Sequence, residues 1–543
     1  MGIPQGQQLQ TATYPASKIT GLLPVFDHAM PRQTPGVLRG ANFRWKTNAI
    51  YSGFGSTNVA NLNAPFVDYL AMYLPFYDGN ILCTQSGIYS FDQTTKLYML
   101  LIGLVPETRT NMHHDYPWTH AHVGNDWFYN HPAIGLVKYD GLCHTWSLVD
   151  RALLNTDPLQ PIYAITHADN RLIFLLSDTV GWSCIDFGDS LRANAICGGG
   201  FQNLSLIRSG HPLGLAPYGK GFLTFTTNGI MLSELSSDPT AAFTHRAFTF
   251  RNTALNPFCI LPFEDNDKNE VIWLGKNGFN ITAGGAIKKW KPEQGNYIEE
   301  YELLRTGIDL ADFSSIKLWH IPEEELLFVS FYDRVAPNFA VSYRSLVLHL
   351  ELDKWSSFDQ PHYTISEIYG TSHRGRSFEF GFLSPSMHTH ILDESRTNAG
   401  QPLEAYVELG PFKFAQESFH SIMTYSQRMS LQMPVPDLQI EGVLEHDLGS
   451  THQSTLHVLD HWSDNLQYYS LPRVRVNGSA DGYTLFEQNW CDASIVAVNG
   501  RDHNFSYNIT AQYLTVSLHA EALGEWFELH HIAVQLQYGG RLF

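Results

Sequence analysis

The chain has 543 residues, which is too long for one hydrophobic core because cores stop growing at about 250–300 residues. With 34 Lys and Arg against 53 Asp and Glu, its formal net charge is −19. This charge argues against ordinary nucleic-acid binding, which depends on contacts of Lys and Arg with phosphate, but it leaves room for DNA that passes without binding. We expect two or three domains.

The composition favours an all-β protein with large contacts between subunits. Charged residues make up 16% of the chain and aromatic residues 13%, whereas about 25% charged residues is usual. The six cysteines form no Cys-x-x-Cys pair, so we expect reduced, buried thiols. The first residues lack the basic and apolar regions of a secretory signal. The longest apolar stretch, residues 97–105, is half as long as a membrane-spanning helix, so we expect no transmembrane segment.

The N-terminal segment, residues 1–64, differs from the rest of the chain. Pro15, Pro24, Pro31 and Pro35 interrupt any regular element in it. We expect an extended arm, followed by a first strand, that packs along other domains or along a neighbouring subunit.

Strand and turn signals dominate the remainder. Asn-Gly and Asp-Gly pairs, which tolerate the positive φ of tight hairpin turns, occur seven times. They are Asp78-Gly79, Asp140-Gly141, Asn228-Gly229, Asn277-Gly278, Asn477-Gly478, Asp481-Gly482 and Asn499-Gly500. Apolar residues alternate with period two, as in Ile532, Val534 and Leu536. No long amphipathic helix is evident.

Residues 65–395 repeat a loose unit of strand, tight turn, strand and a third strand that ends at an Asp. The successive starts lie roughly 35–65 residues apart, which brackets the length of one four-stranded propeller blade. The segments are 81–92, 135–150, 172–186, 221–232, 271–281, 326–350 and 378–393. We predict a β-propeller of six or seven blades. The alternative is a large β-sandwich or several small ones, because hairpins alone do not specify radial closure.

A histidine-rich stretch lies between the first two units. Four His and an Asp could bind zinc or another transition metal, and the side chains of residues 120 and 122 would face one side of a strand. The interpretation we favour is an inserted polar and aromatic loop that contacts a partner or narrows a channel, with no metal. The candidate residues are His113, His114, Asp115, Trp118, His120 and His122.

Five Asp residues close apolar strands, and paired carboxylates are what glycoside hydrolysis requires. They are Asp92, Asp150, Asp186, Asp353 and Asp393. A repeated Asp at a strand end is more often a turn residue, so we predict no catalytic residues, no cofactor and no enzyme activity. A carbohydrate-active or carbohydrate-binding propeller stays the alternative, and a scaffold of the WD type is a third.

The C-terminal part begins after a linker at residues 395–402. Residues 403–543 contain 16 Asp and Glu and 6 Lys and Arg, which gives −10 of the total charge of −19. Their alternation predicts an acidic, β-sandwich-like domain that is long enough to fold alone.

Three stretches together resemble the tail hub and nozzle proteins of short-tailed bacteriophages. The first runs from Arg39 through Trp45 to the Gly53-Phe54-Gly55 turn, after a Pro-rich arm. The second is residues 221–230 with their Asn-Gly turn, and the third is the final strand with Gly539-Gly540-Arg541.

The resemblance implies a homohexameric ring of propeller subunits at the distal end of a phage tail. Such a ring retains the genome and forms the conduit for DNA ejection. Its partners would be a tail adaptor or connector protein, tail fibres or spikes, and genomic DNA that passes without sequence-specific binding. The protein would be located in the virion tail after assembly in the host cytoplasm. The acidic composition is compatible with this role, because attraction to phosphate would slow transit.

Overall fold

The computed structural model is all-β in the part of the chain that it describes, as the sequence predicts. Its elements there are strands and four short 3₁₀ helices, η1 (Ala16–Lys18), η5 (Leu204–Ile207), η6 (Pro257–Cys259) and η9 (Pro322–Glu324). No helix in this part is long and apolar enough to span a membrane. The described residues are 10–22, 35–61, 70–104 (less 78, 93, 94 and 96), 116–149, 160–191 (less 189), 198–237, 241–290 (less 266, 267, 277, 284 and 285), 316–332, 343–369, 378–393, 397–413, 422–432, 474–480, 483–490, 502–520 (less 512) and 526–538.

The chain divides into two compact units, neither of which is continuous in sequence. Unit 1 comprises residues 1–57, 345–360 and 392–543, and unit 2 comprises residues 58–344 and 361–391.

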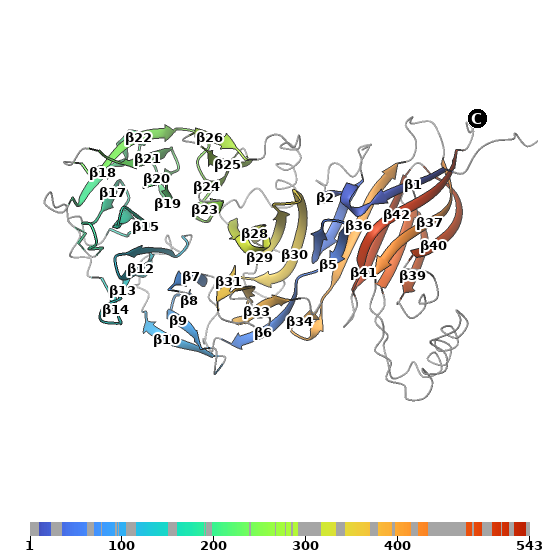
Figure 1. Ribbon diagram of the computed structural model, residues 1–543, viewed down its shortest axis with the longest axis horizontal. Coiled ribbons are helices and arrows are strands. Elements are labelled where there is room, and N and C mark those ends of the chain that lie inside the picture. Colours follow the sequence, from blue (N-terminus) through green and yellow to red (C-terminus); the bar gives the residue numbers. More distant parts are fainter. Residues whose placement is uncertain are drawn as a thin grey trace, which may run out of the picture. The chain divides into compact units, whose positions relative to one another are not determined.

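Unit 2 is built from antiparallel sheets that follow one another along the chain (Figure 1). Blade 1 contains β7 (Met72–Phe76), β8 (Gly79–Cys83), β9 (Gly87–Asp92) and β10 (Leu97–Gly103). Blade 2 contains β11 (Thr119–Val123), β12 (Asp126–His131), β13 (Gly135–Asp140) and β14 (Thr145–Leu148). Blade 3 contains β15 (Ala164–Ala168), β16 (Arg171–Leu175), β17 (Thr179–Trp182) and β18 (Gly200–Asn203). Blade 4 contains β19 (Pro212–Tyr218), β20 (Gly221–Thr226), β21 (Ile230–Leu235) and β22 (Phe243–Thr249).

The remaining blades complete this series. Blade 5 contains β23 (Ile260–Asp265), β24 (Lys268–Gly275), β25 (Gly278–Ala283) and β26 (Ala286–Lys289). Blade 6 begins with β27 (Lys317–Ile321) and β28 (Leu326–Tyr332), and blade 7 contains β31 (Thr364–Tyr369), β32 (Phe378–Leu383) and β33 (His388–Asp393). Strand β6 (Gly55–Asn61) enters unit 2 at residue 58.

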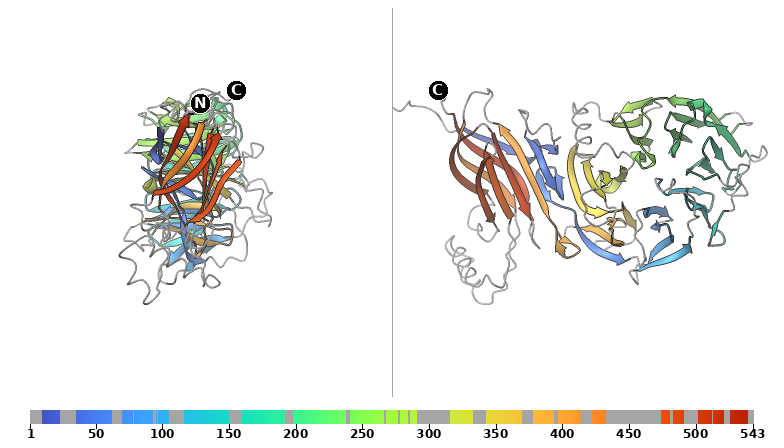
Figure 2. Two further views of the ribbon diagram at one scale, coloured as in Figure 1. Left: turned by 90° about the vertical axis from the view of Figure 1, so that its right-hand side faces the viewer. Right: turned by 180° about the vertical axis from the view of Figure 1, so that it is seen from behind.

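The first strands of the blades form a closed ring, which makes unit 2 a seven-bladed β-propeller. They contact one another in the order β7, β11, β15, β19, β23, β27, β31 and back to β7. Figures 1 and 2 show the blades arranged around this axis. At the closure, Tyr73 and Leu82 of blade 1 pack with Tyr363 and Leu383 of blade 7, and the Tyr73 phenol is 2.8 Å from the Thr389 hydroxyl.

The hydrophobic core lies between blades. Ala121 and Phe128 of blade 2 pack on Leu172 and Phe174 of blade 3. Strand β20 is buried along its whole length, because neighbouring blades cover both of its faces, whereas the outer strands β14 and β26 are largely exposed. Burial on both faces explains why the central strands read as continuous apolar runs.

Unit 1 consists of two sheets that combine both ends of the chain. One has the order β29 (Tyr343–His349), β30 (Lys354–His362), β4 (Phe43–Lys46), β5 (Ala49–Ser52), β42 (Glu528–Tyr538), β37 (Ile422–Gln432) and β40 (Asp502–Ala511), with β1 (Gln10–Pro15) on β42. The other has the order β2 (Thr20–Leu22), β3 (Gly36–Ala41), β36 (Ala405–Lys413), β41 (Tyr513–Ala520), β38 (Val474–Ala480) and β39 (Tyr483–Trp490). Alternate residues on β36 and β41, such as Val407 and Leu518, are fully buried, as in a β-sandwich.

The pairing of chain ends changes the domain boundaries that we expected. In the described residues 10–22 and 35–61, the N-terminal segment packs along another part of the chain, as expected, but as strands of its sheets: β1 pairs with β42 from Gln10 and Leu536 to Pro15 and His531, and β3 pairs with β36. These pairings satisfy edge strands that would otherwise be open. The expected linker at 395–402 contains a hairpin of β34 (Thr397–Asn398) and β35 (Gln401–Pro402), with Ala399 and Gly400 at positive φ.

The cysteines also differ in part from the expectation. Cys184 is disulfide-bonded, and its partner lies outside the described residues. The prediction of reduced thiols is therefore wrong for Cys184, because pairing depends on closeness in space and not on a Cys-x-x-Cys spacing. Cys83 and Cys259 are free and buried, and Cys143 is free and exposed.

Candidate functional site

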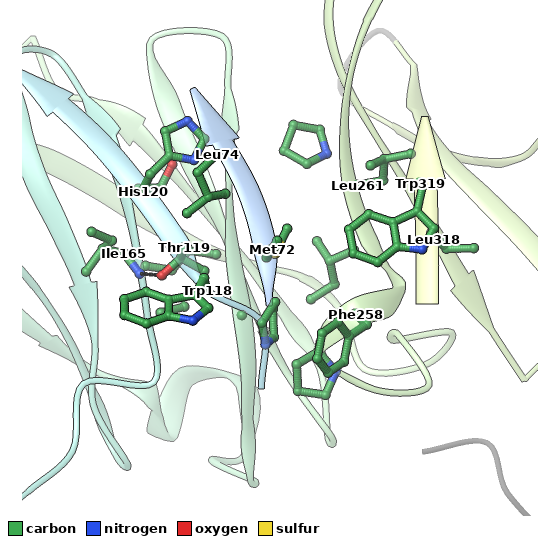
Figure 3. Close-up of a pocket in the computed structure, with 18 of the residues that line it drawn as sticks. Met72, Leu74, Trp118, Thr119, His120, Ile165, Phe258, Leu261, Leu318 and Trp319 are labelled. Carbon is green, nitrogen blue, oxygen red and sulfur yellow. Dashed lines mark hydrogen bonds between the residues drawn. The ribbon is translucent and has the colours of Figure 1, made fainter. Parts of the chain in front are cut away.

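A cavity of about 450 Å³ lies on the axis of the propeller, and every one of the seven first strands contributes to its wall. Figure 3 shows its apolar lining, with Trp118 and Trp319 on opposite sides of Met72. The labelled residues are Met72, Leu74, Trp118, Thr119, His120, Ile165, Phe258, Leu261, Leu318 and Trp319.

The cavity exists because a first strand pairs on one side only. Strand β11, for example, pairs with β12 and turns its other edge toward the axis. Thr119 covers part of that edge: its hydroxyl accepts a hydrogen bond of 3.0 Å from the Ile165 amide of β15. This contact ties blade 2 to blade 3 and is drawn as a dashed line in Figure 3.

The polar groups of the cavity are neutral or weakly basic. Burial, and then the charge of His167, lower the pKa of His120 to about 4, so the imidazole is neutral at pH 7. The buried indole N–H groups of Trp118 and Trp319 have no hydrogen-bond partner among the described residues. A cavity with this lining can hold ordered water or a small neutral molecule.

The structure separates the residues that we predicted as a channel loop. His113, His114 and Asp115 lie outside the described residues. Trp118 is 1% exposed, with its ring 5.3 Å from the His131 ring, and His120 lines the cavity. His122 is exposed and stacks on Trp127 at 4.6 Å.

From Tyr116 onward this stretch is part of blade 2 and not an inserted loop. Strand β11 holds residues 119–123 next to β7 and β15. The alternation of apolar Ala121 and Val123 with the two His is the pattern of a strand that is buried on one face, which our loop interpretation overlooked.

Within the described residues, no group of three or more His, Cys, Asp or Glu side chains is placed to hold a metal ion. The Asp residues at strand ends behave as turn residues where they are described. Asp92 accepts a hydrogen bond of 2.8 Å from the Thr95 hydroxyl, and Asp186 and Asp353 have φ of 58° and 52°. Asp150 and the side chain of Asp393 lie outside the described part.

The sequence reasoning missed two cavity residues, His167 and His320. Like His120, both lie in first strands: His167 and His320 are each the fourth residue of β15 and β27, whereas His120 is the second residue of β11. The repeated Thr-His pair at 119–120 and 166–167 is the signal that an alignment of first strands would have found.

The chain has no relative among known protein families or curated proteins that would assign it a function. No family model matches the chain, and no curated protein matches it. Among solved structures, the extracellular domain of a hybrid two-component system of B. thetaiotaomicron has 9% identity and a TM-score of 0.37. That match covers 63% of this chain and 45% of that domain, so the chain spans less than half of it. YCF48 from Cyanidioschyzon merolae has 8% identity, a TM-score of 0.35 and coverage of 61% and 98%. YCF48 bound to D1 peptide has 11% identity, a TM-score of 0.32 and coverage of 65% and 97%.

Proposed function

We propose that this protein is a structural component of a phage tail, a ring-forming hub or nozzle that retains the genome and forms the conduit for DNA ejection. It acts by assembly and without catalysis. The observation that carries the proposal is the insertion of a propeller into a β-unit that both chain ends build together. Unit 1 takes its strands from residues 1–57, 345–360 and 392–543.

This architecture suits a protein that must resist mechanical force without unfolding. The chain passes between the units after residues 57, 344, 360 and 391, so several covalent connections join them. In unit 1, the N-terminal strands β1 and β3 are hydrogen-bonded to the C-terminal strands β42 and β36. Opening unit 1 therefore requires the loss of ladders between residues that are far apart in the sequence.

The first and third of the stretches that carry the resemblance support the proposal through their location. Residues 39–45 lie in β3 and β4, and the final strand is β42. They belong to one unit, where Leu529 of β42 pairs with Ile50 of β5. Two motifs from opposite ends of the chain thus form one structural element.

The distribution of the net charge is the second observation that supports the proposal. More than half of the net charge of −19 lies in residues 403–543. A conduit with acidic walls repels phosphate, and one with neutral polar walls does not attract it, so DNA can pass without binding. The partners in this proposal are five further copies of the chain, a tail adaptor, and fibres or spikes.

Negative-stain microscopy and mass measurement of the purified protein test the proposal. We expect closed rings with a central hole and a mass of about six chains. A particle that remains a single chain at high concentration would overturn the ring proposal. Hydrolysis of a glycan by that single chain would favour the carbohydrate-active alternative.

A further inference from the structure

A group of aromatic side chains lies at one end of blades 1 and 2, away from the central cavity. We call Phe76, Tyr77, Trp127, Tyr139 and Trp146 the aromatic platform. The Phe76 ring lies 4.7 Å from Tyr77, 5.0 Å from Tyr139 and 5.4 Å from Trp146. The Tyr77 ring is 6.0 Å from Trp127. These residues come from the end of β7, the turn after it, and strands β12, β13 and β14, which are neighbours in Figure 1.

The platform has a rigid base and an open top. Phe76, Trp127 and Trp146 pack against the buried core between blades 1 and 2 and stay partly exposed. Tyr77 is 54% exposed and Tyr139 is buried at 8%, and the exposed His122 ring covers one face of Trp127 by stacking on it. Aromatic faces that are fixed below and open above are suited to stacking with a ligand.

Tyr77 holds its place at a conformational cost. It occupies the two-residue turn between Phe76 and Gly79, and its φ is 49°. Gly, Asn and Asp favour this left-handed region, whereas a bulky side chain is an outlier there. Backbone strain of this kind concentrates at functional sites. An Asn at residue 77 would suit the turn better, so the turn geometry does not explain the Tyr.

An ion pair and neutral polar groups surround the platform. The Lys138 ammonium is 2.8 Å from an Asp126 carboxylate oxygen, so these two charges compensate each other. The Tyr139 hydroxyl is 2.9 Å from Nδ1 of His144, and the Tyr77 and Tyr139 rings are 5.9 Å apart. The surface therefore offers partly exposed aromatic rings inclined to one another around the buried Tyr139, with hydrogen-bonding groups beside them.

We propose that the aromatic platform is a binding site for a neutral glycan. A pyranose ring has an apolar C–H face that stacks on an aromatic ring, and hydroxyl groups at its edge that exchange hydrogen bonds with phenol, imidazole and carboxylate groups. A protein partner is the competing occupant, because aromatic side chains are also enriched at protein interfaces. Strand β10, where Leu97, Met99 and Leu100 are 46%, 52% and 55% exposed, offers a separate apolar surface for such a partner. The inference is independent of the proposed tail function.

The test is titration of the full chain with soluble hexasaccharides of β-1,4-glucose, α-1,4-glucose and β-1,4-N-acetylglucosamine. Tryptophan fluorescence and saturation-transfer NMR are the readouts, since Trp127 and Trp146 lie in the site. We expect saturable binding of at least one probe. Tyr77→Asn should weaken it at least tenfold, and Tyr77→Phe should keep most of it.

The Tyr77→Asn variant also controls for folding, because Asn suits the positive φ and should leave the melting temperature equal or higher. Phe250→Ala is the matched control: Phe250 is 45% exposed and follows β22 of blade 4. It should leave binding unchanged. Absence of saturable binding for all three probes at millimolar concentration overturns the proposal, and so does equal binding by Tyr77→Asn. Binding of a proline-rich peptide in place of every sugar would also overturn it.

Discussion

Asn42, a residue of the first stretch that carries the family resemblance, stabilises unit 1 through its side chain and its backbone. It is 5% exposed with φ of 49°. Its amide nitrogen donates to the Glu404 carbonyl and its amide oxygen accepts from the Asp359 N–H, both at 2.8 Å. Asn42→Ala should destabilise unit 1 by about 3 kcal/mol, from two buried hydrogen bonds and an unfavourable φ.

Hydrogen exchange of the β36 and β41 amides measures this loss. Asn42→Gly tolerates the positive φ and removes only the hydrogen bonds, so it should cost about 2 kcal/mol. Equal protection in the wild type and in Asn42→Ala would contradict the assignment.

His349 makes the stability of unit 1 depend on pH. It is 6% exposed and lies 3.0 Å from the Ser356 hydroxyl. Burial, and then the charges of Arg44 and Lys354, lower its pKa from 6.5 to about 3. The unfolded chain therefore binds the proton more readily, and stability falls as the pH drops from 6.5 toward 3, by about 2 kcal/mol at pH 5.

Exchange of unit 1 amides at pH 7 and pH 5, corrected for intrinsic rates, tests this dependence. His349→Gln keeps a hydrogen-bonding group near Ser356 and cannot gain the charge, so its unit 1 should lose less stability at pH 5. Unit 2 serves as the internal reference. Burial chiefly lowers the pKa of its His390 to about 4, and His349→Gln should leave the response of unit 2 to pH unchanged. An unchanged loss in the variant would show that His349 is not the titrating group.

At the scale of elements, local sequence predicts strands better than it predicts turns. Asn228-Gly229 lies in the turn between β20 and β21, where Phe225 pairs with Ile230. Asn477-Gly478 has the same turn signal and yet lies inside β38, where pairing with both β39 and β41 outweighs the local preference. A dipeptide thus marks a turn only where the strand partners permit one.

Strand β1 depends on a partner more than 500 residues away, and the sequence gives no signal for that pairing. Deletion of β1 tests whether this pairing protects the edge of β42. Removal of residues 1–15 should open the β42 edge between His531 and Leu536, and exposed edges pair with other chains. We expect faster amide exchange in β42 and larger species in size-exclusion chromatography. Removal of residues 1–9 alone, which keeps β1, is the matched control. Unchanged β42 exchange after the longer deletion would contradict the pairing.

At the scale of the whole molecule, the propeller is predictable and its closure is not. Period-two alternation identifies hairpins, but the contact of β31 with β7 joins residues about 300 positions apart. The cavity was missed for the same reason: His120, His167 and His320 come together only when seven first strands surround one axis. The platform was missed because Tyr77 looks like an ordinary turn neighbour until its φ is known.

The composition of unit 1 from both chain ends leads to the last prediction. Residues 403–543, which alternation alone predicts as an independent domain, lack the partners of two of their strands: β3 for β36, and β1 and β5 for β42. Expressed alone, this fragment should unfold without a cooperative transition, and addition of residues 1–57 as a separate chain should restore one. Urea unfolding followed by circular dichroism measures both. Residues 1–57 with Asn42→Ala should restore less, because the Glu404 contact is lost. A cooperative transition in the fragment alone would mean that the sheets of unit 1 are stable without the N-terminal strands.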